Sequence, residues 1–398
     1  MLIIIRQNTK ANEMVSFEFA TAGQIIFGRG KLADLKKIAP SFGSRALVVT
    51  SGSEVRAEPL YAFLKAANID STSFRVTAEP AIELARQGVE LARDFSAEFV
   101  IGFGGGAAID AGKAIAALTA NPGDPLDYLE VIGRGIPLVN APLPYIAVPT
   151  TAGTGAEVTR NAVLASAEHR VKVSLRSPLM LPRLALIDPD LMVSLPPDIT
   201  ASTGMDALTQ VIEPFVSNAA NPMTDAFCRE GIVRAARSLR QAYRDGTNTD
   251  AREDMALAAL FGGLALANAK LGAVHGFAAP IGGMFDAPHG AICAALLAPV
   301  MHANIEALRS RMPQNPALER YAEIARLLTG NPGAAAEDGA AWVETLTRDL
   351  DIPGLSAYGI VSSALDEIAG KAAQASSMKG NPVELTAHEL TGILSGAL

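Results

Sequence analysis

Residues 98–113 read EFVIGFGGGAAIDAGK, which predicts a strand, a glycine-rich turn and a helix in direct succession. The strand part is mostly apolar and β-branched or aromatic, and the run after the glycines is rich in alanine. Glycines at such a turn permit positive φ angles and a close approach of the backbone to a ligand. Because free N–H groups and the helix dipole meet at a helix start, Gly104, Gly105 and Gly106 predict a diphosphate-binding turn.

The glycine pattern alone is weak, because Gly102, Gly104 and Ala107 satisfy only the loose form G-x-G-x-x-A. A purely structural turn would satisfy it almost as well. Its position is more informative, because an ordinary dinucleotide fingerprint follows the first strand of its unit. Here an earlier strand over residues 45–50 is followed by Ser51-Gly52-Ser53 instead. The sequence therefore predicts a nucleotide site with a different layout.

Strand and helix patterns alternate on both sides of this motif, from about Val15 to Asp188. The apolar runs typical of strands lie at 24–27, 46–50, 99–103, 145–148 and 184–187. The helical patterns between them cover 31–39, 59–67 and 81–95. Such alternation predicts an α/β domain with a mainly parallel, doubly wound sheet.

After Asp188 the strand signal disappears, and Pro196-Pro197-Asp198 is typical of a helix start. Helical patterns then cover 198–215, 223–242, 251–275, 299–306, 316–328, 339–350 and 362–374. We therefore expect two domains. Residues 1–190 would form a nucleotide-binding α/β domain, and residues 191–398 an all-α domain that binds metal and substrate.

The composition excludes several classes of partner. At 398 residues and 49% hydrophobic, the chain can bury two cores, and its net charge of −8 argues against nucleic acid and anionic membranes as partners. Its two cysteines, Cys228 and Cys293, form no C-x-x-C motif and lie in contexts typical of packed helices. No stretch approaches the roughly 20 uncharged apolar residues of a spanning helix. We expect a soluble, cytoplasmic protein.

A second chemical signal lies in the helical half, where His275 and His289 stand beside glycines and Asp206 lies in a helical segment. One carboxylate and two imidazoles suit Fe(II) or Zn(II) and leave coordination positions open for a substrate oxygen. A histidine next to glycine can equally satisfy a loop backbone. A nucleotide site in one domain and a metal site in the other predict a cleft between the domains, where cofactor and substrate meet.

These motifs together resemble the iron-containing (group III) alcohol dehydrogenase family of the dehydroquinate synthase-like superfamily. They follow the family's order along nearly the whole chain: residues 104–113, PTTAGTGAE at 149–157, Asp188-Pro189, TGMDAL at 203–208 and the segment 275–289. The resemblance implies a dehydroquinate synthase-like fold. It also implies a metal-dependent oxidoreductase that transfers a hydride between NAD(P)H and an alcohol, aldehyde or ketone.

The resemblance also assigns cofactor residues. Those expected to frame the diphosphate are Gly104, Gly105, Gly106, Asp110 and Lys113. Those expected at the nicotinamide side are Thr150, Thr151 and Thr154, with Asn161 and Lys172 at further cofactor positions. Taken alone, the threonine run would be a polar turn after a buried strand.

Asp206, His275 and His289 match three of the family's metal ligands, but the usual fourth histidine is replaced by Gln210. Residues i and i+4 share a helix face, so Gln210 is expected beside Asp206 at the metal, where its amide oxygen is a poorer ligand than an imidazole. Relatives in the superfamily hold zinc with one carboxylate and two histidines. The metal is therefore expected to be one divalent ion, Fe2+ or Zn2+.

Two further departures concern protons and cofactor choice. Ala279 replaces a histidine that many members use to relay protons, which leaves water or a cofactor ribose hydroxyl for that role, with His302 a candidate only by default. Ser51 stands where NAD-preferring members often carry an Asp that repels a 2′-phosphate. With Arg56 nearby in sequence, we expect NADPH to be preferred and NADH tolerated.

The expected reaction uses the metal to polarise a substrate oxygen while the nicotinamide provides or accepts the hydride. Its substrate would be a small alcohol, aldehyde or ketone, and the protein a homodimer in which residues Val15 to Phe19 supply an intersubunit strand. One alternative is a maleylacetate reductase, which needs cations beyond Lys172 and Lys270. The others are a dehydroquinate synthase-like lyase and a non-catalytic nucleotide-binding relative.

Overall fold

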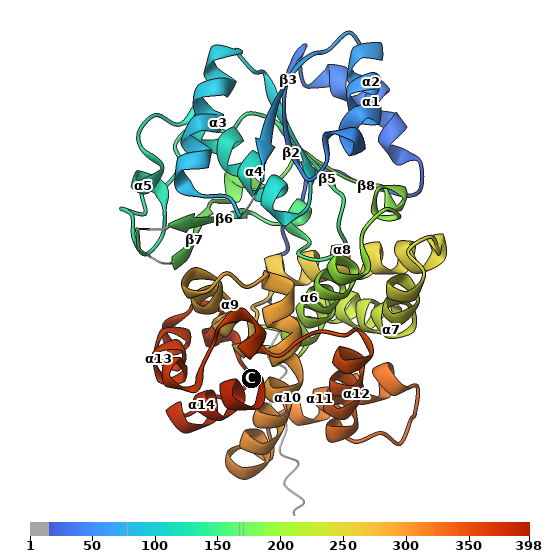
Figure 1. Cartoon of the computed structure of the whole chain (residues 1–398), viewed down its shortest axis with the longest axis vertical. Coiled ribbons are helices and arrows are strands. Elements are labelled where there is room, and N and C mark those ends of the chain that lie inside the picture. Colours follow the sequence, from blue (N-terminus) through green and yellow to red (C-terminus); the bar gives the residue numbers. More distant parts are fainter. Residues whose placement is uncertain (1–15, 78, 167, 170) are drawn as a thin grey trace, which may run out of the picture.

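The computed structural model describes residues 16–77, 79–166, 168–169 and 171–398. In Figure 1 an α/β region, coloured blue to green, lies above a helical region coloured from yellow-green to red. The predicted fold class is confirmed. Val15 lies outside the described residues, and the neighbouring residues 16–19 form no strand within this chain.

A six-stranded sheet forms the centre of the α/β region, in the order β1-β8-β5-β4-β2-β3, and all neighbouring strands run parallel. The strands are β1 (Ile25–Phe27), β2 (Arg45–Ser51), β3 (Asp70–Val76), β4 (Phe99–Gly104), β5 (Tyr145–Pro149) and β8 (Leu184–Ile187). The sequence patterns missed β3, because this edge strand is polar (DSTSFRV) and is defined by its pairing with β2. They also missed the antiparallel pair β6 (Asn161–Ser166) and β7 (Val171–Arg176).

Helices cover both faces of the sheet, because alternate residues of each strand point to opposite sides. Val48 packs with Leu35 and Leu60 on one face, whereas Leu47 packs with Ile115 on the other. The helices are α1 (Leu35–Ile38), α2 (Glu58–Ala66), α3 (Ile82–Asp94), α4 (Gly106–Ala120) and α5 (Pro125–Tyr128). The predicted helix at 31–39 is a mixture, in which 3-10 turns precede and follow α1.

The strand order places a topological switch between β2 and β4. From β2 the chain moves outward to β3, and after β4 it moves the other way to β5. In parallel sheets, ligands bind outside the carboxyl ends of strands at such a switch. Ser51 ends β2 and Gly104 ends β4, so the glycine-rich turn lies at the switch.

The helical region contains α6 (Pro197–Val216), α7 (Pro222–Arg244), α8 (Thr249–Asn268), α9 (Ala273–Met284), α10 (His289–Arg311), α11 (Ala317–Thr329), α12 (Ala336–Asp349), α13 (Leu365–Gln374) and α14 (Ala387–Gly396). We propose the domain boundary near residue 190, because β8 ends at Ile187 and α6 begins at Pro197.

Two predicted helices were wrong in their limits. The segment 251–275 is not one helix, because extended backbone at Ala269 and Gly272 separates α8 from α9, and the two helices meet at 96°. The predicted helix at 299–306 is the middle of α10, which continues through Pro299. His275 therefore lies in the first turn of α9, and His289 is the first residue of α10. Both imidazoles are placed by helix starts rather than by loops.

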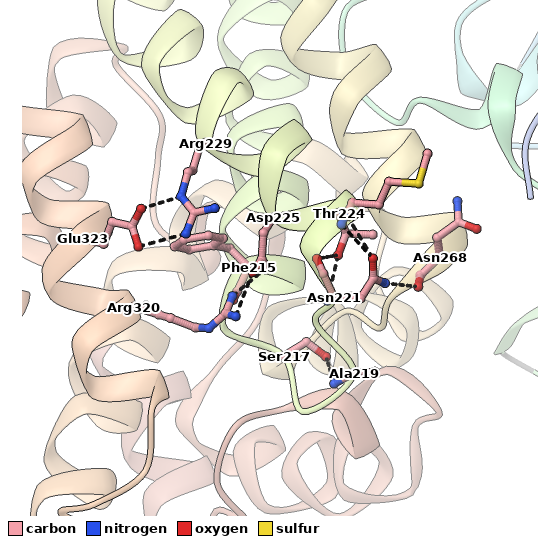
Figure 2. A network of polar contacts seen from close by, with 11 residues as sticks. Phe215, Ser217, Ala219, Asn221, Thr224, Asp225, Arg229, Asn268, Arg320 and Glu323 are labelled. Atoms are coloured by element: carbon pink, nitrogen blue, oxygen red, sulfur yellow. Dashed lines mark hydrogen bonds and ion pairs between the residues drawn. The ribbon is translucent and has the colours of Figure 1, made fainter. Parts of the chain in front are cut away.

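A polar network holds the carboxyl end of α6 against α7 and α11 (Figure 2). The Phe215 ring lies 5.0 Å from the guanidinium groups of both Arg229 and Arg320. Arg320 binds Asp225 with both terminal nitrogens, at 2.7 and 2.8 Å, and Arg229 pairs with Glu323. Stacked guanidinium groups and bidentate ion pairs of this kind restrict side-chain motion. The network therefore holds in place the helix that carries Asp206.

Among the described helices, α10 alone is by itself long and apolar enough to cross a membrane, and α8 with α9 would pass only as a bent pair. Of the apolar window of α10, 72% is buried inside the protein. The helix packs against α6, α9 and α12, as a core helix does.

Candidate active site

Asp206, His275 and His289 come together from α6, α9 and α10. The Oδ1 atom of Asp206 lies 3.4 Å from Nε2 of His275 and 3.7 Å from Nε2 of His289. Asp206 is 2% exposed, and this oxygen accepts no hydrogen bond from the described residues. A buried carboxylate oxygen without a hydrogen-bond donor, facing two imidazole nitrogens, fits a divalent cation bound between them.

Glu213 orients His275. Its Oε2 atom lies 2.7 Å from Nδ1 of His275, and its Oε1 accepts a hydrogen bond of 2.7 Å from the Val274 N–H. A carboxylate on Nδ1 fixes the tautomer and points Nε2 toward the metal position. The sequence reasoning missed Glu213. The available signal was a carboxylate two helical turns after Asp206, in the apolar run VIEPFV.

Cys293 joins the three predicted residues in a group of four possible metal donors. The sequence reasoning missed this cysteine, as it missed Glu213. Its Sγ lies 3.8 Å from Nε2 of His289 and 4.0 Å from Nε2 of His275. One donor atom from each of Asp206, His275, His289 and Cys293 lies within 4.8 Å of all the others. Cys293 follows His289 by four residues on α10, so the two share a helix face. That spacing was the signal, but the cysteine was interpreted as ordinary core.

Gln210 lies on the same face of α6 as Asp206, as predicted, but its amide has another partner. Its Nε2 donates a hydrogen bond of 3.2 Å to the carbonyl oxygen of Gly153. Gly153 belongs to the turn that carries the three threonines. Gln210 thus connects α6, the helix of Asp206, to the turn from Thr150 to Thr154.

Electrostatic interactions within the cluster favour the deprotonated forms of Asp206 and Cys293 and positive charge on the imidazoles. Burial would raise the pKa of Asp206, but His289, His275 and Gln210 hold it below its usual value. Burial would likewise raise the pKa of the Cys293 thiol, but the two imidazoles lower it. In turn, burial opposes charge on His289, yet Cys293 and Asp206 raise its pKa to about 9. The site therefore suits a cation.

The glycine-rich turn packs closely against the ends of neighbouring strands. Gly104 has φ +155°, and a Cβ on it would lie 2.3 Å from Ser51 Oγ. The Gly105 N–H donates to that same oxygen at 3.2 Å, and Gly105 caps α4. A Cβ on Gly106 would lie 3.0 Å from Thr154. We name this group, Ser51 with Gly104, Gly105 and Gly106, the cradle.

Lys113 and Asp110 are engaged with the protein itself. Lys113 is 1% exposed, and its Nζ donates to the carbonyl oxygens of Ala156 and Asn161, both at 2.7 Å, and to Thr159 Oγ1 at 3.0 Å. The Asp110 Oδ2 accepts a hydrogen bond from the Val163 N–H at 3.0 Å. These contacts join α4 to the segment from Ala156 to Val163, which follows the turn from Thr150 to Thr154 in the chain.

The other predicted cofactor residues lie around the same turn. The Thr150 N–H donates to Gly104 O at 2.8 Å, and the Thr151 side chain approaches Gly105. Asn161 begins β6 and contributes its backbone oxygen to Lys113. Lys172 on β7 pairs with Glu79 at 3.3 Å and lies against Gly282 of α9, the helix of His275.

The turn from Thr150 to Thr154, with the following Gly155, packs directly against the helical region. A Cβ on Gly155 would lie 2.5 Å from the Cα of Gly263 in α8, and a Cβ on Gly153 would lie 3.0 Å from Thr203 in α6. Together with the Gln210 hydrogen bond, these close approaches pack the turn from Thr150 to Thr154 and Gly155 against α6 and α8.

A cavity of about 800 Å³ lies elsewhere, at the amino ends of the strands, where Gln24, Phe42, Pro144 and Arg183 are among its lining residues. The glycine-rich turn and Thr150 follow the carboxyl ends of β4 and β5, which is the opposite edge of the sheet. The volume of that cavity therefore does not locate the chemistry of this protein.

Comparisons with known proteins agree with the geometry. Residues 22–189 match the family model described as iron-containing alcohol dehydrogenase, and residues 200–398 match the model of the Fe-containing alcohol dehydrogenase family, C-terminal. The chain is 33% identical to a choline dehydrogenase of Bacillus subtilis (strain 168), over 95% of this chain and 94% of that protein. It is 34% identical to a 1,3-propanediol dehydrogenase of Klebsiella pneumoniae, over 96% of this chain and 98% of that protein. The crystal structure of a 1,3-propanediol oxidoreductase superposes with a TM-score of 0.89 at 34% identity, over 96% of this chain and all of the other.

Proposed function

This chain belongs to the iron-containing alcohol dehydrogenase family and is a metal-dependent oxidoreductase of alcohols and their carbonyl counterparts, and we propose that Asp206, His275 and His289 hold its metal. The observation that carries the proposal is the buried Asp206 oxygen without a hydrogen-bond donor, facing two imidazole nitrogens. The resident groups would be NAD(P)H and one divalent ion, Fe2+ or Zn2+.

When bound, the metal polarises the substrate oxygen and the nicotinamide supplies or accepts the hydride. The residues of this chain do the positioning. Asp206 provides the negative charge, Glu213 holds the His275 ring in one orientation, and the turn from Thr150 to Thr154 would hold the nicotinamide. The Gln210 bond to Gly153 fixes that turn relative to the metal helix. Such fixed geometry is the protein's main contribution to catalysis.

No histidine relay follows from this geometry. Ala279 lies one helical turn after His275, and His302 is exposed on α10, 13 residues beyond His289. At 1.5 Å per residue that separation is about 20 Å along the helix. We propose that the proton leaves through water or a cofactor ribose hydroxyl.

We propose that the cofactor is NADPH by preference, with NADH tolerated. Ser51 presents a small hydroxyl where a carboxylate would repel a 2′-phosphate. The Arg56 guanidinium is held by the Leu191 carbonyl oxygen at 2.6 Å, so the sequence candidate is engaged elsewhere. Arg75, at the end of β3, donates to Gly52 O at 3.1 Å and is exposed, which places a cation beside this turn.

The remaining cofactor residues take different roles in this proposal. Gly104, Gly105 and Gly106 would approach the diphosphate, while Asp110 and Lys113 would support the turn from beneath rather than touch the phosphates. Asn161 and Lys172 stay proposed cofactor neighbours.

The substrate class we propose is a small alcohol, aldehyde or ketone. A maleylacetate-type oxo-acid would need free cations, and Lys172 is already paired with Glu79. A non-catalytic role fits less well, since four side chains that could hold a metal converge despite the changes at Gln210 and Ala279. We also propose a cytoplasmic homodimer. Phe17, 45% exposed and without strand pairing in the described chain, is a candidate contact.

The test is metal content and turnover in protein purified without oxygen or chelators. We expect about one iron or zinc per chain in the wild type, and loss of metal together with about a thousandfold loss of activity in His275→Ala. His302→Ala, a change to an exposed histidine of the same region, should retain both. Metal-free His275→Ala protein that still turns over would refute the proposed mechanism.

A further inference from the structure

We propose that the Cys293 thiolate is the fourth protein ligand of the metal, and that this chain is therefore a zinc enzyme with an Asp–His–His–Cys site, where a substrate oxygen would enter as a fifth ligand. The inference rests on the proposed function, since it concerns the same metal. It assigns a role to a side chain that the sequence analysis placed in the core, and it explains how the site can lack a histidine at Gln210.

The distances support this assignment. In a tetrahedral zinc site, bonds of about 2.3 Å to sulfur and about 2.0–2.1 Å to nitrogen and oxygen place neighbouring donors about 3.3–3.6 Å apart. Four of the six donor separations are 3.4 Å (Asp206–His275), 3.7 Å (Asp206–His289), 3.8 Å (Cys293–His289) and 4.0 Å (Cys293–His275). These four come within about half an ångström of that range and all donors lie within 4.8 Å of one another, so side-chain shifts of about 1 Å would close the cluster around one ion.

The other cysteine shows what an ordinary core cysteine does in this protein. Cys228 on α7 is buried in the same apolar cluster of the helical region as Cys293, but it belongs to no group of metal donors among the described residues. Cys293 instead points its sulfur at two imidazoles. In the part of the chain that the structure describes, one group of such donors could hold a metal, and it includes Cys293 but not Cys228.

Gln210 offers only its neutral amide oxygen, a weaker ligand than a thiolate, and its amide nitrogen donates to the carbonyl oxygen of Gly153. A thiolate changes the chemistry of the site in two ways. As a soft ligand it favours zinc over Fe(II), which prefers nitrogen and oxygen donors. It also brings the protein charge at the metal to two, from Asp206 and Cys293, which balances a divalent ion. The metal chosen by this chain would thus follow from one cysteine on α10.

X-ray absorption at the zinc edge of the purified holoprotein tests the proposal directly. We expect a zinc–sulfur scattering path at about 2.3 Å in the wild type. Cys293→Ala should lose this path and bind zinc about 10- to 100-fold more weakly in chelator competition. Cys228→Ala should keep both the path and the affinity, with folding of both variants checked by circular dichroism.

The outcomes separate this inference from the proposed function. Wild-type protein that binds zinc or iron and turns over, but shows no sulfur scattering, overturns the inference and leaves the proposed function standing. Zinc affinity unchanged in Cys293→Ala has the same meaning. Wild-type protein that takes up neither metal overturns both. If Cys293→Ala fails to fold, the scattering of the wild type alone still decides.

Discussion

The cradle and the metal cluster are built in opposite ways. The cradle comes mainly from one continuous strand–turn–helix, residues 98–113, and its properties lie in the backbone: a positive φ, the N–H groups at the start of α4 and the absence of Cβ atoms. The metal cluster comes from three helices, and its properties lie in side chains that tertiary packing brings within 4.8 Å. A glycine-rich turn can be predicted from a short sequence pattern. The meeting of side chains from three helices depends on where the helices begin and end and on the angles at which they cross.

The comparison predicts that the cradle is most sensitive to a single added methyl group. In Gly104→Ala, the Cβ would lie 2.3 Å from Ser51 Oγ at a φ of +155°. Strain of about 1–3 kcal/mol at this turn should raise the KM for the cofactor by up to about a hundredfold, while metal content is unchanged. Initial-rate kinetics and metal analysis would measure both.

Gly359→Ala is the matched control, because Gly359 also has a positive φ, +79°, but a Cβ there would meet nothing within 4 Å. Its KM should match the wild type. If Gly104→Ala bound the cofactor normally, the close packing of the cradle would have no role in binding.

In the metal cluster, metal affinity should be most sensitive to the hydrogen bonds of Glu213. Glu213→Gln keeps the shape of the side chain but replaces one of the two oxygens that bind His275 and the Val274 N–H. We expect metal affinity to fall about 10- to 100-fold with the KM for the cofactor unchanged. Glu319→Gln, at an exposed carboxylate of α11, is the control. A change in cofactor KM without a change in metal affinity would show that the two regions are not separable in this way.

A smaller effect is expected from charge at the edge of the cradle. Ser51→Asp adds a carboxylate at the end of β2, next to the Arg75 and Gly52 contact. Repulsion of the 2′-phosphate should lower kcat/KM for NADPH roughly tenfold and leave NADH largely unaffected. Ser53→Asp introduces the same charge two residues later and should change the ratio less. A wild type that already prefers NADH would contradict the NADPH proposal before any variant is made.

The success of the sequence predictions differs in the same way between local backbone features and side chains that tertiary packing brings together. It predicted five of the six strands of the parallel sheet, because their apolar cores are continuous, and missed β3, whose polar residues take strand form only by pairing with β2. It predicted that Asp206, His275 and His289 meet, but through a family resemblance rather than through spacing. It joined α8 and α9 into one helix, so the position of His275 relative to α10 could not be derived. Glu213 and Cys293 were missed for the same reason: each looks like a core position until the helices are packed.

The junction of the two regions carries a buried carboxylate, and its removal should have the smallest effect of these changes. Glu157 is 3% exposed, and burial raises its pKa from 4.5 to about 7. Because the folded pKa is the higher one, the contribution of Glu157 to stability is fully present below pH 4.5 and is lost as the pH rises from about 4.5 to about 7. Glu157→Gln removes this loss, so its Tm should exceed that of the wild type by about 1 °C at pH 8, equivalent to about 1 kcal/mol for a chain of this length, and converge with it near pH 4.5. Glu344→Gln, at an exposed carboxylate of α12, should not show this pH dependence. A Glu157→Gln protein less stable than the wild type at pH 8 would mean that the charged carboxylate and Lys113 stabilise the junction, rather than burial opposing it.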